Sequence, residues 1–316
     1  MSPEKINNIE LEFAKNLTDS NGTIHTSIDT IDIGDGITIN QIRPKYKSYY
    51  YNQNTEKKAI CLHFTVGNIK GDIGSLTKEN THISVNYVVD RLGNIYNLFD
   101  DSVWSYHLGS GAIGTNCIMS KHTIGIEISN YGPLKLKNDC LIDAYGSVYC
   151  NVKDTEYYKE CDYRGYNYYA TMTDKQEKAV AKLLHYLCKE HNIPEVWKDN
   201  TDQLFMDGVI AKNFSGIYFH TSVRKDKFDW PMPMFQNVKD IFDGKKKKTI
   251  TETKIKPEPK PELIEEQKPM VEETLKEIIN DSNEIVKENL QMETKKLKNK
   301  SFFETIIDFI INLFKK

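Results

Sequence analysis

The sequence lacks both a strong net charge and an apolar N-terminal segment. Its 316 residues carry a formal net charge of −3, which is too little to bind nucleic acid by bulk electrostatics. The first residues, MSPEKINNIELEFAKN, include no apolar stretch of the kind found in a secretory signal. We therefore expect no nucleic-acid partner, and synthesis in the cytoplasm without a signal peptide.

Paired cysteines are also lacking. No C-x-x-C pair occurs, which argues against a structural zinc knuckle. A disulfide framework is disfavoured in a chain of this length without a secretory signal, so we expect most thiols to be free. The six cysteines are Cys61, Cys117, Cys140, Cys150, Cys161 and Cys188.

The composition is ordinary for a soluble domain, with 28% charged and 39% hydrophobic residues. Its length allows one large domain with additional segments. The 18 tyrosines cluster, for example at residues 49–51, 157–158 and 168–169. Such clusters either cover a polar ligand such as a sugar or form a tyrosine-rich sheet surface, and both interpretations stay open.

Several segments have the apolar patterns of strands. The run AICLHFTV, residues 59–66, is almost continuously apolar and predicts a buried strand. The segments ISVNYVV and NIYNLF flank the turn-like DRLGN and predict a hairpin. TIGIEIS, residues 123–129, and GIYFH, residues 216–220, predict two more strands.

Residues 171–193 predict the clearest helix. Thr173 and Gln176 have the spacing of a capping box, and an apolar stripe follows at helical spacing. Strands that alternate with few helices predict a mixed α/β fold, with a central mixed β-sheet flanked by helices.

Changes in composition divide the chain. Residues 1–42 form a polar N-terminal extension with one or two predicted edge strands, and residues 43–243 form the main domain. Within it, residues 131–171 are rich in Tyr, Cys and Lys without a firm period, so they are predicted to be an insertion. Residues 244–269 are a Lys/Glu/Pro-rich linker.

The C-terminal part is predicted to be a helical tail. Residues 270–300 are charged and have apolar residues roughly at helical spacing, and residues 301–316 form an amphipathic helix. At ~1.5 Å per residue, the apolar stretch 302–314 of this helix is about 20 Å long, too short for a hydrocarbon core of ~30 Å. Its apolar side chains suit a membrane interface, although docking on its own domain or self-association are equally open.

Two histidines and an aspartate suggest a metal site. His63 lies near the end of one apolar strand and His220 ends another, and Asp229 follows in the next loop. Each histidine alone is more easily explained as a structural residue. Together with Asp229 they form a set of two imidazoles and one carboxylate, which is typical of a catalytic zinc site with a fourth position open for water.

Glu127 and Lys227 are the candidate catalytic residues. Glu127 lies between two isoleucines of a strand, and alternation directs it to the opposite face. There it could act as a general base for a zinc-bound water, while Lys227 could stabilise an oxyanion. The alternatives are a salt-bridged surface glutamate and a solvated loop lysine.

The segments AICLHFTVG, WSYHLG, TIGIEIS and HTSVRKDKFDWP, in this order, resemble the zinc-dependent N-acetylmuramoyl-L-alanine amidases of the amidase-2 family. That family includes phage amidase lysozymes and peptidoglycan recognition proteins. The resemblance covers roughly residues 43–238. It implies that His63, His220 and Asp229 bind one Zn²⁺ ion.

The resemblance also implies the catalytic and substrate-binding residues. Glu127 matches the glutamate of an IGIE motif, and Lys227 matches the catalytic lysine two residues before the third ligand. His107 matches a histidine of the substrate-cleft motif, with Trp104 nearby, and Asn86 stands where a histidine is common. Two departures are the KFDWP ending, where the proline follows one residue later, and the DRLG turn.

The remaining histidines and Cys61 have weaker claims to a site. Cys61 shares the strand face of His63, but a packing thiol is the simpler interpretation. Structural roles are expected for His82, His122, His185 and His191.

The resemblance implies hydrolysis of the amide between N-acetylmuramic acid and L-alanine in bacterial peptidoglycan. A phage-type endolysin, which acts on the cell wall after synthesis in the host cytoplasm, is the expected context. Two other functions stay open. One is a peptidoglycan-binding module without catalysis, and the other is a virion-associated interaction protein that acts through its tail.

Overall fold

The computed structural model describes residues 1–17, 22, 24–198, 204–205 and 207–245. The chain divides into two units, Met1–Ile250 and Thr251–Lys316. The second unit lies outside the described residues. The predicted linker beyond residue 245, the charged segment 270–300 and the amphipathic helix 301–316 therefore stay predictions.

The described part of the chain contains helices α1–α6, strands β1–β12 and one short 3₁₀ helix, η1. In chain order these are α1 Pro3–Asn16, β1 Ile24–Asp32, β2 Thr38–Pro44, β3 Ala59–Phe64, α2 Ile69–Leu76, β4 Tyr87–Val89, β5 Ile95–Asn97, α3 Asn116–His122, β6 Thr123–Ile128, β7 Pro133–Lys137, β8 Cys140–Ile142, β9 Val148–Asn151, β10 Tyr158–Tyr163, β11 Tyr166–Ala170, α4 Asp174–Glu190, α5 Gly208–Asn213, β12 Gly216–Phe219, η1 His220–Ser222 and α6 Met232–Phe242.

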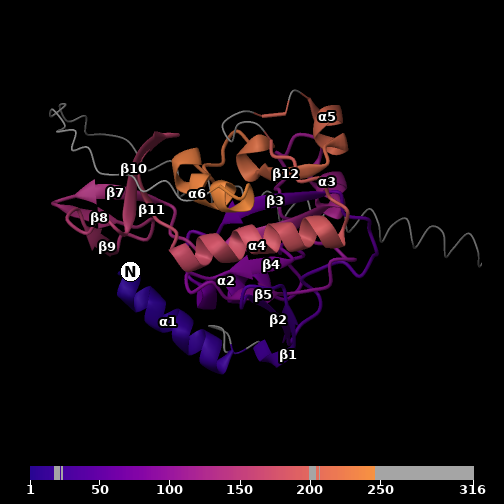
Figure 1. Cartoon of the computed structure of the whole chain (residues 1–316), viewed down its shortest axis with the longest axis horizontal. Helices are drawn as coiled ribbons and strands as arrows, with labels where there is room; N and C mark the ends of the chain where they lie inside the picture. Colours follow the sequence, from indigo (N-terminus) through magenta and orange to yellow (C-terminus); the bar gives the residue numbers. More distant parts are fainter. Residues whose placement is uncertain (18–21, 23, 199–203, 206, 246–316) are drawn as a thin grey trace, which may run out of the picture. The chain divides into compact units, whose positions relative to one another are not determined.

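The main sheet has seven strands in the order β1-β2-β5-β4-β6-β3-β12 (Figure 1). The pairs β4-β6, β6-β3 and β3-β12 are parallel. The pairs β1-β2 and β4-β5 are antiparallel. The predicted mixed α/β sheet is confirmed. Because β3, β6 and β12 are parallel, their carboxyl ends meet at one edge of the sheet.

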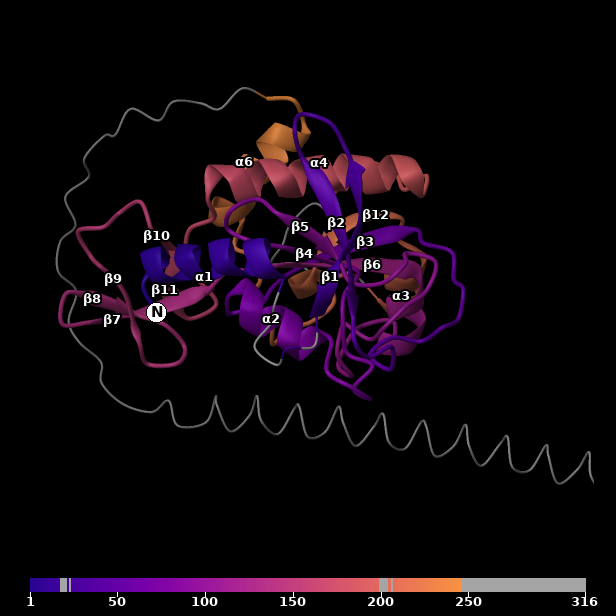
Figure 2. The same ribbon diagram turned by 90° about the horizontal axis from the view of Figure 1, so that it is seen from below.

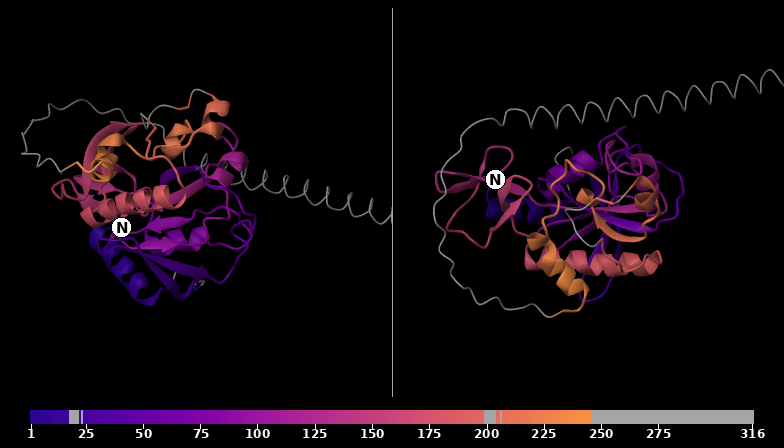
Figure 3. Two further views of the ribbon diagram at one scale, coloured as in Figure 1. Left: turned by 45° about the vertical axis from the view of Figure 1, so that its right-hand side comes forward. Right: turned by 90° about the horizontal axis from the view of Figure 1, so that it is seen from above.

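Strand alternation gives the sheet two different faces. On one face, Ile60, Leu62, Ile124 and Ile126 pack in one apolar core with α4 and α6. Figures 2 and 3 show these two helices together on that side of the sheet. On the other face, Val88 packs in a second core that includes residues of α1 and α2. Residues 61, 63, 125 and 127 face the same way as Val88, because they alternate with the isoleucines and leucine of the first core.

The predicted capping box of the long helix is half right. The Thr173 hydroxyl accepts a hydrogen bond from the Gln176 amide at 3.1 Å, as a cap requires. The Gln176 side chain does not return to the cap. It is fully buried and donates to the carbonyl oxygens of Val89 and Ser129 at 3.2 and 3.0 Å. Gln176 therefore ties the helix to the ends of two strands.

The N-terminal extension contains a helix that the sequence analysis missed. Strand β1 lies at the edge of the main sheet and β2 lies between β1 and β5, but Pro3–Asn16 form α1. The buried residues Ile6, Glu10 and Phe13 have helical spacing. In the sequence, Glu10 interrupts the apolar pattern of this stripe. In the structure it is nevertheless buried and accepts a hydrogen bond from the Arg91 amide at 2.9 Å.

The predicted insertion forms a second sheet with its own core. Strands β7–β11 pair antiparallel in the order β10-β11-β7-β8-β9. Its buried residues include Tyr131, Tyr149 and Tyr158, which pack with Ile6 of α1. These tyrosines therefore serve in the core of the inserted sheet.

Two smaller expectations concern the cysteines and the membrane. All six cysteines are free thiols in the structure. Among the residues that the structure describes, no helix combines the length and the hydropathy that crossing a membrane requires.

Candidate metal and catalytic site

The carboxyl edge of the parallel strands brings the three predicted metal ligands together. His63 precedes the last residue of β3, and His220 follows β12 directly. Asp229 returns to them from the loop before α6. Their side chains are 2%, 11% and 7% exposed, so all three are removed from bulk water.

The separations of the ligand atoms scatter around those that a tetrahedral ion needs. His63 Nδ1 lies 3.0 Å from His220 Nδ1. Asp229 Oδ2 lies 3.4 Å from His220 Nδ1 and 3.8 Å from His63 Nδ1. Zinc–ligand bonds of about 2.0–2.2 Å in a tetrahedron place ligand atoms about 3.3–3.6 Å apart. The three side chains therefore fit one Zn²⁺ ion.

The outer hydrogen bonds orient both imidazoles for this role. His220 Nε2 lies 3.1 Å from the Leu108 carbonyl oxygen, which can only accept, so Nε2 carries the proton and Nδ1 the lone pair. His63 Nε2 lies 3.1 Å from His107 Nδ1. A proton on His63 Nε2 satisfies this contact and leaves a second lone pair at Nδ1. Metal-bound histidines commonly have such outer partners.

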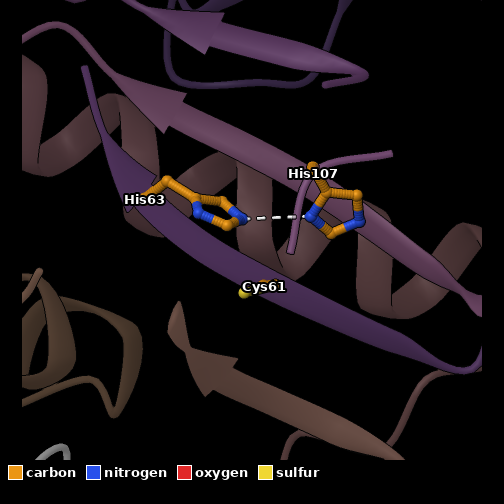
Figure 4. Close-up of side chains that lie close together, drawn as sticks. All are labelled: Cys61, His63 and His107. Carbon is orange, nitrogen blue, oxygen red and sulfur yellow. Dashed lines mark hydrogen bonds between the residues drawn. The ribbon is translucent and has the colours of Figure 1, made fainter. Parts of the chain in front are cut away.

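Burial keeps His63 neutral, as a metal ligand must be. Burial lowers the pKa of His63 well below its usual value, and the neighbouring histidines lower it further. Burial also lowers the pKa of His107 to about 3. Figure 4 shows the His107 ring facing the His63 ring, with Cys61 on the strand of His63.

Cys61 could join a different group with His63 and His107, since their ligand atoms also lie within 4.8 Å of one another. Burial raises the pKa of the Cys61 thiol well above its usual value. The set of His63, His220 and Asp229 supplies two imidazoles and one carboxylate at 3.0–3.8 Å and leaves a fourth position for water, so it is the better catalytic metal site.

Glu127 lies beside His63, because the two residues are paired across β3 and β6. Its Oε2 atom is buried and has no hydrogen-bond partner. Burial raises the pKa of Glu127 well above its usual value; Asp229 and Asp72 raise it further, and the positive charge of Lys227 opposes them. A buried carboxyl without a partner at this position suits proton transfer rather than a structural role.

The loop that carries Lys227 and Asp229 is held by the inserted sheet. Strands β10 and β11 are joined by Arg164 and Gly165, which both have positive φ, as a tight hairpin turn requires. Arg164 Nη1 donates hydrogen bonds to the backbone carbonyls of Lys225 and Lys227, the latter at 2.6 Å. The sequence analysis missed this contact.

The predicted substrate-binding residues have internal partners instead. Asn86 is buried and bonds to the Gly125 amide and the Asp101 carboxylate, both at 3.3 Å. Trp104 is buried, stacks on Tyr51 and donates to Gln53 at 3.1 Å. His107 contacts His63. A contact of these side chains with substrate stays a prediction.

Four further histidines, His82, His122, His185 and His191, have partners away from this site. His82 stacks on Tyr51, and the remaining three bond to oxygen atoms of neighbouring residues: His122 to Glu56, His185 to Glu195 and Phe242, and His191 to Asp101.

Solved structures with a similar trace include two amidases and one hydrolase. The complex of the N-acetylmuramyl-L-alanine amidase AmiD from E. coli with its substrate has 15% identity and a TM-score of 0.38, over 67% of this chain and 65% of that chain. LysC from Clostridium intestinale URNW has 13% identity and a TM-score of 0.36, over 64% and 97%. The hydrolase AmiA from Staphylococcus aureus has 12% identity and a TM-score of 0.37, over 75% and 90%.

No match was found among curated proteins. The family assignment rests on a direct match to the family described as N-acetylmuramoyl-L-alanine amidase, over residues 52–229. This segment is more than half of the chain and contains both histidines and the aspartate of the site. The chain therefore belongs to the N-acetylmuramoyl-L-alanine amidase family, whose members are hydrolases that act on peptidoglycan.

Proposed function

We propose that the chain hydrolyses the amide bond between N-acetylmuramic acid and L-alanine in bacterial peptidoglycan, with one Zn²⁺ ion held by His63, His220 and Asp229. The observation that supports this most strongly is the convergence of these three ligand atoms at 3.0–3.8 Å, within the matched family segment. A bound zinc ion would polarise the scissile carbonyl and lower the pKa of water towards ~7.

Glu127 is the proposed general base. Its unpartnered Oε2 atom lies beside His63 in the neighbouring strand, where it can take a proton from the attacking water. In the protein without metal, burial holds the pKa of this carboxyl high. A nearby dication favours the charged form of the carboxyl, which is the form that a base needs. The same carboxyl, once protonated, can return its proton to the leaving amine.

Lys227 is the proposed oxyanion stabiliser. It lies two residues before Asp229, and its positive charge acts on both Glu127 and His63. A cation near the ligands can stabilise the negative charge that develops on the carbonyl oxygen. Arg164 restricts the backbone around Lys227, which supports a defined position for this charge.

The direct test is digestion of purified peptidoglycan by the full chain with zinc, followed by mass spectrometry. Free stem peptides that begin with L-alanine, together with glycan strands that have lost them, are the expected products. His220→Ala is the matched control and should release neither. Stem peptides that stay attached to N-acetylmuramic acid after digestion with the zinc-loaded wild type would contradict the proposal.

We further propose that the enzyme acts as a phage-type endolysin and that residues 301–316 contact a membrane surface. The amphipathic pattern of that segment supports the second idea. The isolated segment 300–316 should become helical on anionic vesicles, and circular dichroism measures this directly. A segment that stays unfolded on such vesicles would contradict the membrane contact.

A further inference from the structure

A second group of potential metal ligands shares one residue with the candidate zinc site. Cys61, His63 and His107 bring a thiol sulfur and two ring nitrogens within 4.8 Å of one another. Cys61 and His63 lie two residues apart on one face of β3, and the His107 ring faces His63 (Figure 4). The proposed amidase mechanism makes no use of the Cys61 thiol.

A glycine makes room for the His107 ring over this part of the sheet. Gly125 is paired with Cys61 across β3 and β6. A Cβ added at Gly125 would lie 3.1 Å from His107 Cγ and 2.8 Å from Val85 Cγ1, which is closer than such atoms normally approach. The missing side chain at residue 125 therefore lets the imidazole lie close to Cys61.

His63 can supply a ligand atom to either group, but only to one at a time. A neutral imidazole has one protonated nitrogen and one nitrogen with a lone pair. With the proton on Nε2, His63 donates to His107 Nδ1 at 3.1 Å and offers Nδ1 to zinc. With the proton on Nδ1, it donates to His220 Nδ1 at 3.0 Å and offers Nε2 to the second group. Both tautomers therefore have a hydrogen-bond partner within the site.

The donor atoms and their burial restrict the kind of ion that fits. Cys61 and His63 are buried, whereas His107 is partly exposed. A thiolate selects soft ions such as Cu⁺. One Cu⁺ and one thiolate together carry no net charge, so the buried group stays neutral, whereas a dication would leave a positive charge without compensation. On binding, a Cu–S bond replaces the S–H bond and the thiol proton passes to solvent.

We propose that Cys61 Sγ, His63 Nε2 and His107 Nδ1 form a binding site for the soft monovalent ion Cu⁺, and that this site and the zinc site exclude one another. Cu⁺ on Nε2 fixes the proton of His63 on Nδ1, which removes one of the three zinc ligands. Zinc on Nδ1 fixes that proton on Nε2 and closes the copper site. The copper site itself does not depend on the proposed amidase activity, because binding is measured without turnover.

The test titrates the full-length protein, prepared without metal, with Cu⁺ in the absence of oxygen and in competition with a Cu⁺ chelator. The wild type should bind Cu⁺ with an ultraviolet thiolate-to-copper absorption band. Cys61→Ser should lose this band and still bind zinc, since the three zinc ligands remain. Cys61→Ala, which adds no hydroxyl group to the core, is the second variant and should give the same result. Cys117→Ser, at a partly buried thiol of α3, is the matched control and should keep the band.

His220→Ala provides the reverse comparison. It removes a zinc ligand and leaves all three copper ligands, so it should lose zinc and keep the absorption band. Asp229 Oδ2, 3.8 Å from His63 Nδ1, is still present in this variant to accept the His63 proton. In the wild type, saturation with Cu⁺ should lower the zinc content measured by elemental analysis.

Two results would overturn the inference. One is an absorption band that persists in both Cys61 variants, and the other is full occupancy of the wild type by both ions at once. Failure of the proposed function is distinguishable from either. A zinc-loaded wild type that cleaves no peptidoglycan, but whose copper band is lost only in the Cys61 variants, would refute the amidase activity and support the copper site.

Discussion

Arg164 offers the sharpest test of whether the inserted sheet takes part in catalysis. Its guanidinium reaches from the β10–β11 turn to the backbone carbonyls of Lys225 and Lys227. These carbonyls belong to the loop that presents Lys227 and Asp229 to the site. Arg164→Met removes the two donors but retains an unbranched side chain of similar length.

The expected magnitude follows from these two contacts. A hydrogen bond from a charged group contributes about 1.5–3 kcal/mol, and Arg164 is partly exposed, so the lower limit applies. A loss of about 1.4 kcal/mol in positioning corresponds to tenfold in rate. We expect kcat of Arg164→Met to fall about tenfold while KM stays within twofold, because the charge of Lys227 is needed mainly in the transition state. Zinc content should be retained, since all three ligands remain.

The assay is steady-state hydrolysis of a soluble muropeptide, at a temperature well below the melting temperature of each variant. Arg164→Lys should recover part of kcat, since it can reach one carbonyl. Lys159→Met, an exposed position of the same hairpin, controls for the loss of positive charge. A wild-type kcat in Arg164→Met, or an equal fall in Lys159→Met, would refute the positioning role.

Five further variants test the site and the core. His220→Ala should lose most bound zinc by elemental analysis, and full occupancy would remove it from the ligand set. Glu127→Gln should keep zinc but lower kcat by ~10²–10⁴-fold. Lys227→Met should also keep zinc and lower kcat by ~10²–10³-fold. A wild-type kcat in either variant would exclude that residue from the catalytic mechanism. His107→Phe should weaken zinc binding about 10–100-fold in a chelator competition, and unchanged affinity would show that the outer contact is dispensable. Burial raises the pKa of Glu10 in the folded state, so the contribution of Glu10 to the free energy of unfolding is full at acidic pH and falls as the pH rises towards that raised pKa. In Glu10→Gln, the free energy of unfolding measured by chemical denaturation should fall less steeply with pH. An unchanged pH dependence would contradict this prediction.

The three candidate ligands could be picked out from the sequence because each one is a local feature of the chain. A histidine at the end of an apolar strand, or a carboxylate a few residues later, can be recognised within ten residues of sequence. The role of His107 could not be recognised in this way. Its ring contacts His63, and the adjacent Leu108 carbonyl orients His220. These outer contacts join segments that lie far apart in the chain, so no local pattern reveals them.

The position of the insertion could nevertheless have been derived from the topology. Strands β3, β6 and β12 are parallel, so the chain leaves β6 at the same edge where His63 and His220 lie. The inserted sheet begins at Pro133, only five residues after the last residue of β6. A segment inserted there must fold close to that edge, because so short a connection spans at most about 18 Å. Arg164, from the β10–β11 turn of the insertion, therefore reaches the loop that carries Lys227 and Asp229. Shortening the β10–β11 turn should lower kcat, because it removes this contact.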